Sequence, residues 1–203
     1  MSAERTIQAQ TIAEVALEIG ADAIAHGSTG AGNDQVRFDL MFQVMCPKIE
    51  IITPIRDLSL SREDEIQFLK NHNYEMDFDK AKYSINKGLW GTSVGGKETL
   101  TSRHHLPEEA FPSQIERTEP SQLEIEFKNG ELISVNGKTY SHPVLAIQKI
   151  EELASPYGIG RDIHVGDTIV GIKGRVGFEA AAASIIIKAH HLLEKHTLSK
   201  YQQ

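Results

Sequence analysis

The chain has 203 residues, of which 40% are hydrophobic and 24% are charged, the balance of an ordinary globular protein. Its formal net charge is −7, and it lacks the clustered lysines and arginines that a nucleic-acid partner requires. No apolar stretch reaches the roughly 20 residues of a membrane span, and the first residues do not form a signal peptide. The single cysteine, Cys46, excludes an internal disulfide and follows an apolar run, which indicates packing. We therefore expect a cytoplasmic protein that binds neither nucleic acid nor membrane.

The first part of the chain alternates helical and strand patterns. Apolar residues recur at helical spacing up to Gly20, where a helix would end. Two short apolar runs indicate buried strands, and Asn33 or Asp34 is placed to cap the helix between them. The expected order is a helix at 4–19, a strand at 21–26, a glycine-rich loop at 27–32, a helix to 45 and a strand at 49–53. This alternation is typical of a parallel α/β sheet.

The pattern changes in the second part of the chain. Ser61, with Asp64 three residues later, predicts a capped helix start. From Leu123 onward, apolar and polar residues alternate as they do in antiparallel strands. The other expected features are a connection at 71–83, hairpin turns at Asn129-Gly130 and Asn136-Gly137, a helix from about 143, a strand at 168–173 and a helix at about 178–196. We predict an α+β second domain that begins near residue 75.

The stretch HGSTGAGNDQVRFD, residues 26–39, is the strongest candidate for a site. Its glycines let a ligand approach the backbone closely, and it leads from a strand into a helix, whose first amide groups attract anions. Asn33 and Arg37 are one helical turn apart, and Arg37 can bind a carboxylate through two hydrogen bonds. The glycine spacing matches neither standard nucleotide motif. From the residues alone, an anion or amino-acid site and a plain capped turn both remain open.

The same stretch closely resembles the signature of argininosuccinate synthases. The resemblance continues through IEIITPIRD, YSINKGLWGTSVGGKE, LEIEFKNGELISVNG, GIGRD and GIKGRVGFE, and covers nearly the whole chain. It implies an α/β fold in which a partial Rossmann-like parallel sheet, of the adenine-nucleotide alpha-hydrolase type, precedes an α+β synthetase domain with antiparallel strands. The domains would be 1–74, the later part of a nucleotide-binding domain, and 75–203, an incomplete synthetase domain.

The resemblance also implies a reaction and its substrates. In that family ATP activates the ureido oxygen of citrulline as an adenylate, pyrophosphate leaves, and aspartate then displaces AMP to give argininosuccinate, a step of arginine biosynthesis and the urea cycle. Mg²⁺ is implied through ATP, with no prosthetic group and no metal site of the chain's own. A homotetramer is implied as well. We read the pairs His104-His105 and His190-His191 as surface or helix residues, because adjacent histidines lack ligand spacing.

Each site residue follows from a match to the family motif, and no residue is assigned to catalysis itself. The resemblance places Gly27 beside the nucleotide; Thr29, Asn33 and Asp34 around aspartate; and Asn33, Arg37, Ser84 and Ser93 around citrulline. Asp34 would receive the ammonium group of aspartate, while Thr29 and Asn33 would bond its carboxylates. Considered without the resemblance, the two serines indicate caps or surface groups, and Trp90 indicates packing.

Two departures from the family pattern bear on activity. The SGGLDTS-like phosphate loop that opens the family's sequence has no counterpart here, and neither does its C-terminal tail. We therefore expect the chain as it stands not to catalyse the full reaction, and a non-catalytic remnant remains an alternative. An amidotransferase synthetase is a further alternative, but Cys46 lies in a helical pattern and suits a glutaminase nucleophile poorly.

The third departure concerns the citrulline pocket. Gly166 and Phe178 stand where the family has a glutamate and a tyrosine, although a one-residue shift would bring in Asp167. A buried ammonium group without a partner is costly, whereas an amide does not need that partner. An N-acylated citrulline is therefore an alternative substrate to citrulline.

Overall fold

The computed structural model describes residues 2–30, 32–74 and 83–202, which form two compact units. The first unit contains Ser2–Lys82 together with Val165–Gly174, and the second contains Tyr83–His164 together with Arg175–Gln203. The connection predicted at 71–83 lies in large part outside the described residues. Among the described residues, no helix combines the length and the apolar character that a membrane crossing requires.

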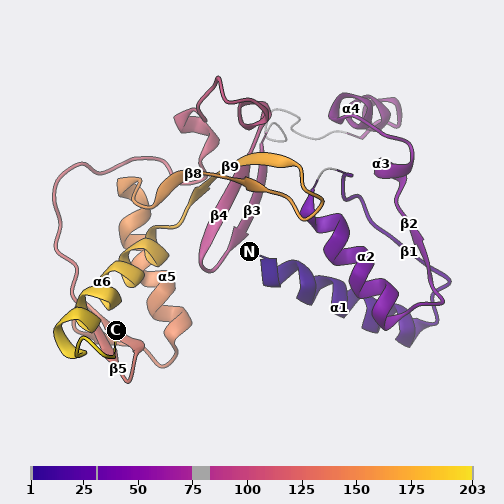
Figure 1. Ribbon diagram of the computed structural model, residues 1–203. Coiled ribbons are helices and arrows are strands. Elements are labelled where there is room, and N and C mark those ends of the chain that lie inside the picture. The colour runs from indigo at the N-terminus through magenta and orange to yellow at the C-terminus, as the bar shows by residue number, and fades with distance from the viewer. Residues whose placement is uncertain (1, 31, 75–82, 203) are drawn as a thin grey trace. The chain divides into compact units, whose positions relative to one another are not determined.

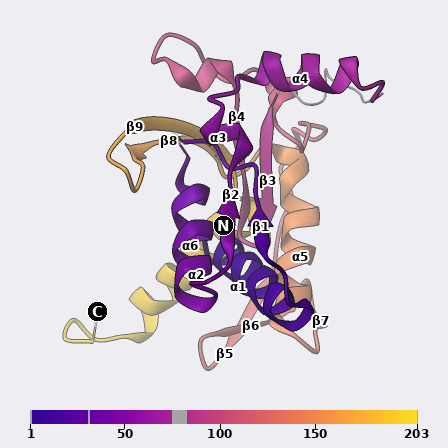
Figure 2. The same ribbon diagram turned by 90° about the vertical axis from the view of Figure 1, so that its right-hand side faces the viewer.

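The first unit is a small parallel sheet covered by two helices. β1 (Ala23–Ala25) pairs in parallel with β2 (Glu50–Ile52), and α1 (Ser2–Ile19) and α2 (Asn33–Met45) lie side by side in both ribbon views (Figure 1, Figure 2). The small side chains on α1 let the helices approach closely. The core of the unit consists of Ala9, Ala13, Ala16, Ile24, Phe42 and Cys46. The predicted helix–strand–helix–strand order is confirmed.

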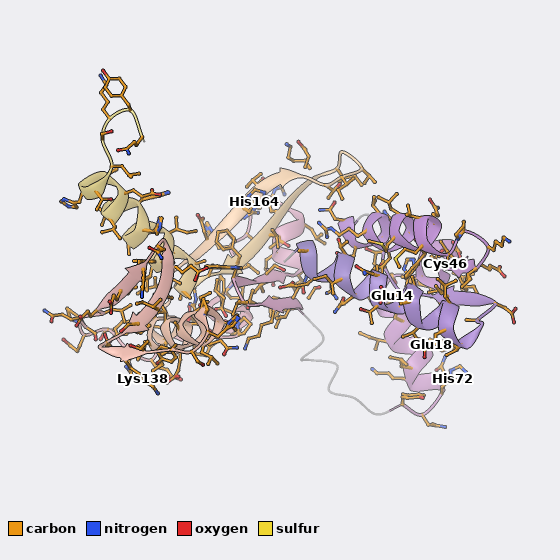
Figure 3. All side chains as sticks on the ribbon, turned by 90° about the horizontal axis from the view of Figure 1, so that it is seen from below. Glu14, Glu18, Cys46, His72, Lys138 and His164 are labelled. Atoms are coloured by element: carbon orange, nitrogen blue, oxygen red, sulfur yellow. The ribbon has the colours of Figure 1, made fainter. Side chains whose placement is uncertain are left out.

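Cys46 and Gly20 behave as their sequence contexts predict. Cys46 ends α2, where its backbone N–H donates to the carbonyl of Phe42, and its side chain is buried in the core (Figure 3). Gly20 follows α1 with a φ of +66°, a conformation that glycine adopts without a side-chain penalty. The packing role of Cys46 is confirmed, and its burial argues against a reactive thiol.

Two short helices follow β2. Pro54 does not merely stop the strand, as expected, but begins the helix α3 (Pro54–Asp57), because proline suits the first helical position. α4 (Arg62–Asn71) starts with the predicted capping box: Asp64 N–H donates to Ser61 Oγ, and the Asp64 carboxylate accepts from Ser61 N–H and Oγ. These hydrogen bonds from Ser61 hold the pKa of Asp64 below its ordinary value of 3.8.

The second unit contains two antiparallel sheets and two main helices. The larger sheet has the strand order β3 (Ser84–Gly88), β4 (Gly91–Gly95), β9 (Lys173–Glu179), β8 (Arg161–Asp167). The smaller sheet consists of β5 (Ile125–Lys128), β6 (Glu131–Val135) and β7 (Lys138–Thr139). α5 (Pro143–Ala154) and α6 (Ala181–Thr197) pack against β6 around a core of Leu132, Val135, Ala146, Ile147, Ile150, Ala182 and Ile186. Short 3₁₀ helices occupy Lys97–Leu100, Glu108–Ala110 and Ser155–Tyr157.

The predicted hairpin turns are confirmed. Asn129 and Asn136 have φ values of 53° and 51°, and the glycines that follow them are also left-handed. Two consecutive positive φ angles define the type I′ turn, which asparagine followed by glycine adopts most readily. These turns set the register of β5, β6 and β7.

Three sequence predictions in the later part of the chain are wrong. Residues 168–172 do not form a strand, and only Lys173, the first residue of β9, does. Thr168 N–H donates to the carbonyl of Ile172, and Gly171 has a φ of +82°, so the segment turns between β8 and β9. The last helix begins at Ala181 rather than 178, because Phe178 and Glu179 pair with β4. Residues 84–95 form the hairpin of β3 and β4, and Trp90, which the sequence assigned to packing, is half-exposed at its turn.

Candidate functional site

The glycine-rich loop leaves the carboxyl end of β1 and enters α2. His26 N–H donates to the carbonyl of Ile52, which extends the pairing of β1 with β2 to the first residue of the loop. Gly32 is the N-cap residue of α2 and has an extended backbone conformation. Among the described residues, no side chain accepts a hydrogen bond from the backbone N–H groups of the first turn of α2. The prediction that Asn33 or Asp34 caps the helix is therefore wrong, because both side chains have other partners. The first amides of α2 remain available to an anionic group.

The loop glycines are not required by the packing of the chain. A Cβ atom added to Gly27, Gly30 or Gly32 would lie no closer than 3.5 Å to the atoms around it, an ordinary contact distance. None of the three has a positive φ. Neither sterics nor backbone conformation therefore demands glycine at these three positions, and the absence of side chains leaves the backbone open to close approach.

Asp34 lies between two guanidinium groups. Arg37 Nη1 is 2.7 Å from Asp34 Oδ1, and Arg5 Nε, from α1, is 3.3 Å from Asp34 Oδ2. The three side chains together carry one excess positive charge, and all are partly exposed. A zwitterion that brings an ammonium group to Asp34 and a carboxylate to the arginines would match this arrangement.

The structure brings together the loop residues that the sequence predicts. Gly27, Thr29, Asn33, Asp34 and Arg37 all lie in the loop or the first turns of α2. Thr29 is exposed, and its carbonyl accepts from Gly32 N–H at 3.3 Å. Asn33 Oδ1 accepts from Ile169 N–H at 2.6 Å, and residues 165–174 belong to the same compact unit. Arg5 was missed, because its place in an exposed helical pattern carries no local signal.

Ser84, Ser93 and Phe178 share one face of the larger sheet in the second unit. Ser93 lies directly opposite Phe178 on β9, and Ser84 lies opposite Gly95, two residues from Ser93 on β4. Residues two apart on a strand, and residues opposite each other on paired strands, point to the same side of a sheet. The structure therefore gathers these three predicted residues on one surface.

Gly166 belongs to the other compact unit. It lies in the part of β8 that belongs to the first unit, whereas Phe178 belongs to the second, so the two residues of the predicted pocket are not brought together within one unit. The neighbouring Asp167, a possible substitute for the missing glutamate, pairs with Lys173 at 2.7 Å.

On the opposite face of the larger sheet lies a cluster of charged and polar side chains around the buried Glu179, which the sequence did not indicate. The Glu179 carboxylate accepts from Ser113 Oγ at 2.9 Å and lies 3.7 Å from Arg161 Nε. Arg161 also donates to both carboxylate oxygens of Glu108 and stacks on the ring of Phe111. The hydrogen bond from Arg161 lowers the pKa of Glu108 from its usual range. These contacts hold the segment 108–113 against the sheet, which is a structural role.

Comparison with known proteins matches the chain to one family along both units. The description "Arginosuccinate synthase N-terminal HUP domain" matches residues 1–75, and "Arginosuccinate synthase C-terminal domain" matches residues 83–203. The argininosuccinate synthase of Methanocaldococcus jannaschii is 38% identical over 199 residues, 97% of this chain and 50% of the relative. Those of Dehalococcoides mccartyi and Pyrococcus furiosus are 41% and 40% identical over 203 and 201 residues, 50% and 48% of those proteins.

The chain thus spans about half the length of the curated relatives it matches. The family matches agree with the parallel sheet of the first unit and the antiparallel sheets of the second. On this similarity, which extends over almost all of its residues, the chain belongs to the argininosuccinate synthase family.

Proposed function

We propose that this chain binds aspartate and citrulline as part of an argininosuccinate synthase, a ligase that uses ATP and releases AMP and pyrophosphate. The observation that carries the proposal is the set of polar side chains at the start of α2, where Asp34 lies between Arg5 and Arg37 beside an open helix N-terminus. Family membership supports the identity of the substrates.

The proposed roles follow the charges of the substrates. Asp34 receives the ammonium group of aspartate, and Thr29 and Asn33 bond its carboxylates. Arg37, together with Asn33, binds citrulline, and Ser84 and Ser93 supply further hydrogen bonds to it. Gly27 lies beside the nucleotide, which enters as its Mg²⁺ complex. The division into residues 1–74 and 75–203, a homotetrameric assembly and a cytoplasmic location complete the proposal.

The proposed reaction has two steps. The ureido oxygen of citrulline attacks the α-phosphorus of ATP, so that an O–P bond forms and pyrophosphate leaves. The amine of aspartate then attacks the ureido carbon, AMP leaves with the oxygen, and the amine loses a proton. Most of the rate enhancement would come from holding charged substrates in line and from donors aimed at developing charge.

Replacing Asp34 with asparagine tests the ammonium contact. We expect the affinity for L-aspartate, relative to that for succinate, to fall about tenfold, because succinate has the two carboxylates but no ammonium group. Isothermal titration calorimetry with both ligands measures the ratio of the two affinities. Because both ligands carry two carboxylates, this ratio separates the loss of the ammonium contact from the general gain in positive charge. Asp22→Asn, at an exposed position between α1 and β1, removes the same charge and should leave the ratio unchanged. Absence of aspartate binding by the unmodified chain would refute the proposal.

An N-acylated citrulline is a second candidate substrate, favoured by Phe178. Phe178 lies opposite Ser93 on the paired strand, and its phenyl ring offers no hydroxyl group to a charged α-amine. If this candidate is right, N-acetylcitrulline binds at least as tightly as citrulline. The variant Phe178→Tyr is then expected to shift the ratio of affinities toward citrulline by about fivefold, the effect of one hydrogen bond. A strong preference of the unmodified chain for citrulline would reject the candidate.

A further inference from the structure

A network of polar side chains lies behind the glycine-rich loop, and none of its members has a role in the proposed substrate contacts. The side chains come from the end of β1, from α2, and from the segment after β2, all within the first compact unit. The members of the network are His26, Gln35, Asp39, Thr53, Arg56 and Asp57, whose carboxylate accepts from Thr53 Oγ1 at 2.7 Å. Gln35 and Thr53 are buried, and His26, Asp39 and Arg56 are partly buried.

Two members of the network bond directly to the backbone of the loop. His26 Nδ1 accepts from Ser28 N–H at 3.3 Å, and the Gln35 side-chain amide donates to the carbonyl of Gly30. The imidazole of His26 is 9% exposed and Gln35 is 8% exposed, so water competes weakly for these hydrogen bonds. The loop is therefore pinned at two points, on either side of Thr29.

The remaining members hold His26 and Gln35 in place. Arg56 Nη1 donates to Asp39 Oδ2 at 2.6 Å and to Gln35 Oε1 at 3.0 Å, and Arg56 Nη2 donates to Thr53 Oγ1 at 3.1 Å. A planar guanidinium group holds its acceptors in a fixed geometry, whereas the three donors of a lysine ammonium group rotate freely. The bond from Arg56 to Gln35 Oε1 leaves the amide nitrogen of Gln35 to face Gly30.

Asp39 decides the protonation of the His26 ring. Its Oδ1 lies 2.8 Å from His26 Nε2, and an ionised carboxylate only accepts hydrogen bonds, so Nε2 must carry the proton. The other nitrogen, Nδ1, lies 3.3 Å from Ser28 N–H, which donates to it, and a nitrogen that accepts a hydrogen bond carries no proton. The ring also stacks on Phe38, with the centroids 5.5 Å apart, which limits its rotation.

We propose that His26 and Gln35 are positioning residues of the glycine-rich loop, oriented by the Asp39–Arg56 ion pair, with His26 acting as the neutral Nε2–H tautomer. The proposal rests on the proposed function, since the loop matters only if it binds substrate. This positioning holds Gly27 and Thr29 in one conformation before a ligand arrives, so that the loop loses less conformational entropy on binding.

Two substitutions of His26 separate this role from plain core stabilisation. In His26→Asn, Oδ1 occupies the place of Nδ1, two bonds from Cβ, and keeps the acceptor for Ser28. In His26→Gln, the amide nitrogen occupies the place of Nε2, three bonds from Cβ, and keeps the bond to Asp39 instead. If His26 positions the loop, the Ser28 amide should exchange with water about fivefold faster in His26→Gln and within about twofold of the unmodified rate in His26→Asn. If the network only stabilises the core, the Ser28 amide should exchange more slowly in His26→Gln than in His26→Asn. That result would overturn the proposal.

A second measurement needs no variant. In the unmodified chain at neutral pH, ¹⁵N NMR should show an unprotonated Nδ1 and a protonated Nε2 on the His26 ring. The opposite tautomer, or a doubly protonated ring, would overturn the proposal even if both variants failed to fold. Titration with L-aspartate separates the failure of the proposed function from the failure of the positioning role. If the unmodified chain does not bind L-aspartate, the proposed function is refuted. The exchange rate of the Ser28 amide and the tautomer of His26 then still test whether His26 positions the loop. If aspartate binds, His26→Gln should weaken it about fivefold and His26→Asn should not.

Discussion

Replacing Phe42 with alanine is expected to lower the free energy of unfolding of the first unit by about 3–5 kcal/mol. Phe42 is 1% exposed and packs with Ala9, Ala13 and Ile24 where α1, α2 and β1 meet. The small side chains around it cannot extend into the space that the ring leaves, so a cavity remains. Hydrogen exchange measured by mass spectrometry, on peptides from residues 2–74 in increasing urea, gives the change in stability.

Val44→Ala is the matched control for Phe42. It lies two residues away on the same helix, is 70% exposed, and is expected to change stability by no more than about 0.5 kcal/mol. The fluorescence of Trp90, the single tryptophan, reports the second unit and should keep its urea midpoint in both variants. A small loss in Phe42→Ala, similar to that of the control, would mean that this core is not packed as described.

Substituting Gly160 by alanine is expected to destabilise the second unit by about 2–5 kcal/mol. Gly160 has a φ of +77°, where a side chain costs about 1–2 kcal/mol. An added Cβ would also lie 2.5 Å from the backbone oxygen of Ala180, which is held because Ala180 N–H donates to the carbonyl of Gly160. Relieving that contact requires the start of α6 to move away from β8, at a further cost of about 1–3 kcal/mol. Urea unfolding followed by Trp90 fluorescence measures the loss.

Gly137→Ala separates the two contributions. Gly137 has nearly the same φ, +73°, but nothing lies within 4 Å of an added Cβ. This variant should therefore lose only the backbone penalty, about 1–2 kcal/mol. Equal losses at the two positions would show that α6 accommodates the extra methyl group without cost.

Local patterns predicted many of the elements correctly. The helix of residues 2–19, the capping box at Ser61 and the turns at Asn129 and Asn136 depend on residues a few positions apart. Such short-range contacts form in the same way in many folds, so the sequence patterns that indicate them in one protein also indicate them in another. The glycine-rich loop belongs to this class, because its position between strand and helix follows from neighbouring residues.

The strand errors had a long-range cause. Ser84–Gly88 and Gly91–Gly95 contain three glycines and no clear alternation, and they form strands because β4 can pair with β9, about 80 residues along the chain. The same pairing extends β9 through Phe178 and Glu179, which an alanine-rich sequence had assigned to a helix. In TIVGIK, residues 168–173, the β-branched residues suggested a strand, but the pairing of β8 with β9 makes residues 168–172 their turn.

By itself, the sequence determined the order of elements from α1 to β2, the hairpin turns of the second unit, and the loop with Gly27, Thr29, Asn33, Asp34 and Arg37. Only the tertiary structure decided which groups surround that loop. Arg5 reaches Asp34 from another helix, and Arg56 reaches Asp39 from the segment after β2. The physical reason is the range of the interaction: a turn or cap is selected by neighbours in the chain, whereas an ion pair between elements exists only after packing has brought them within a few ångströms.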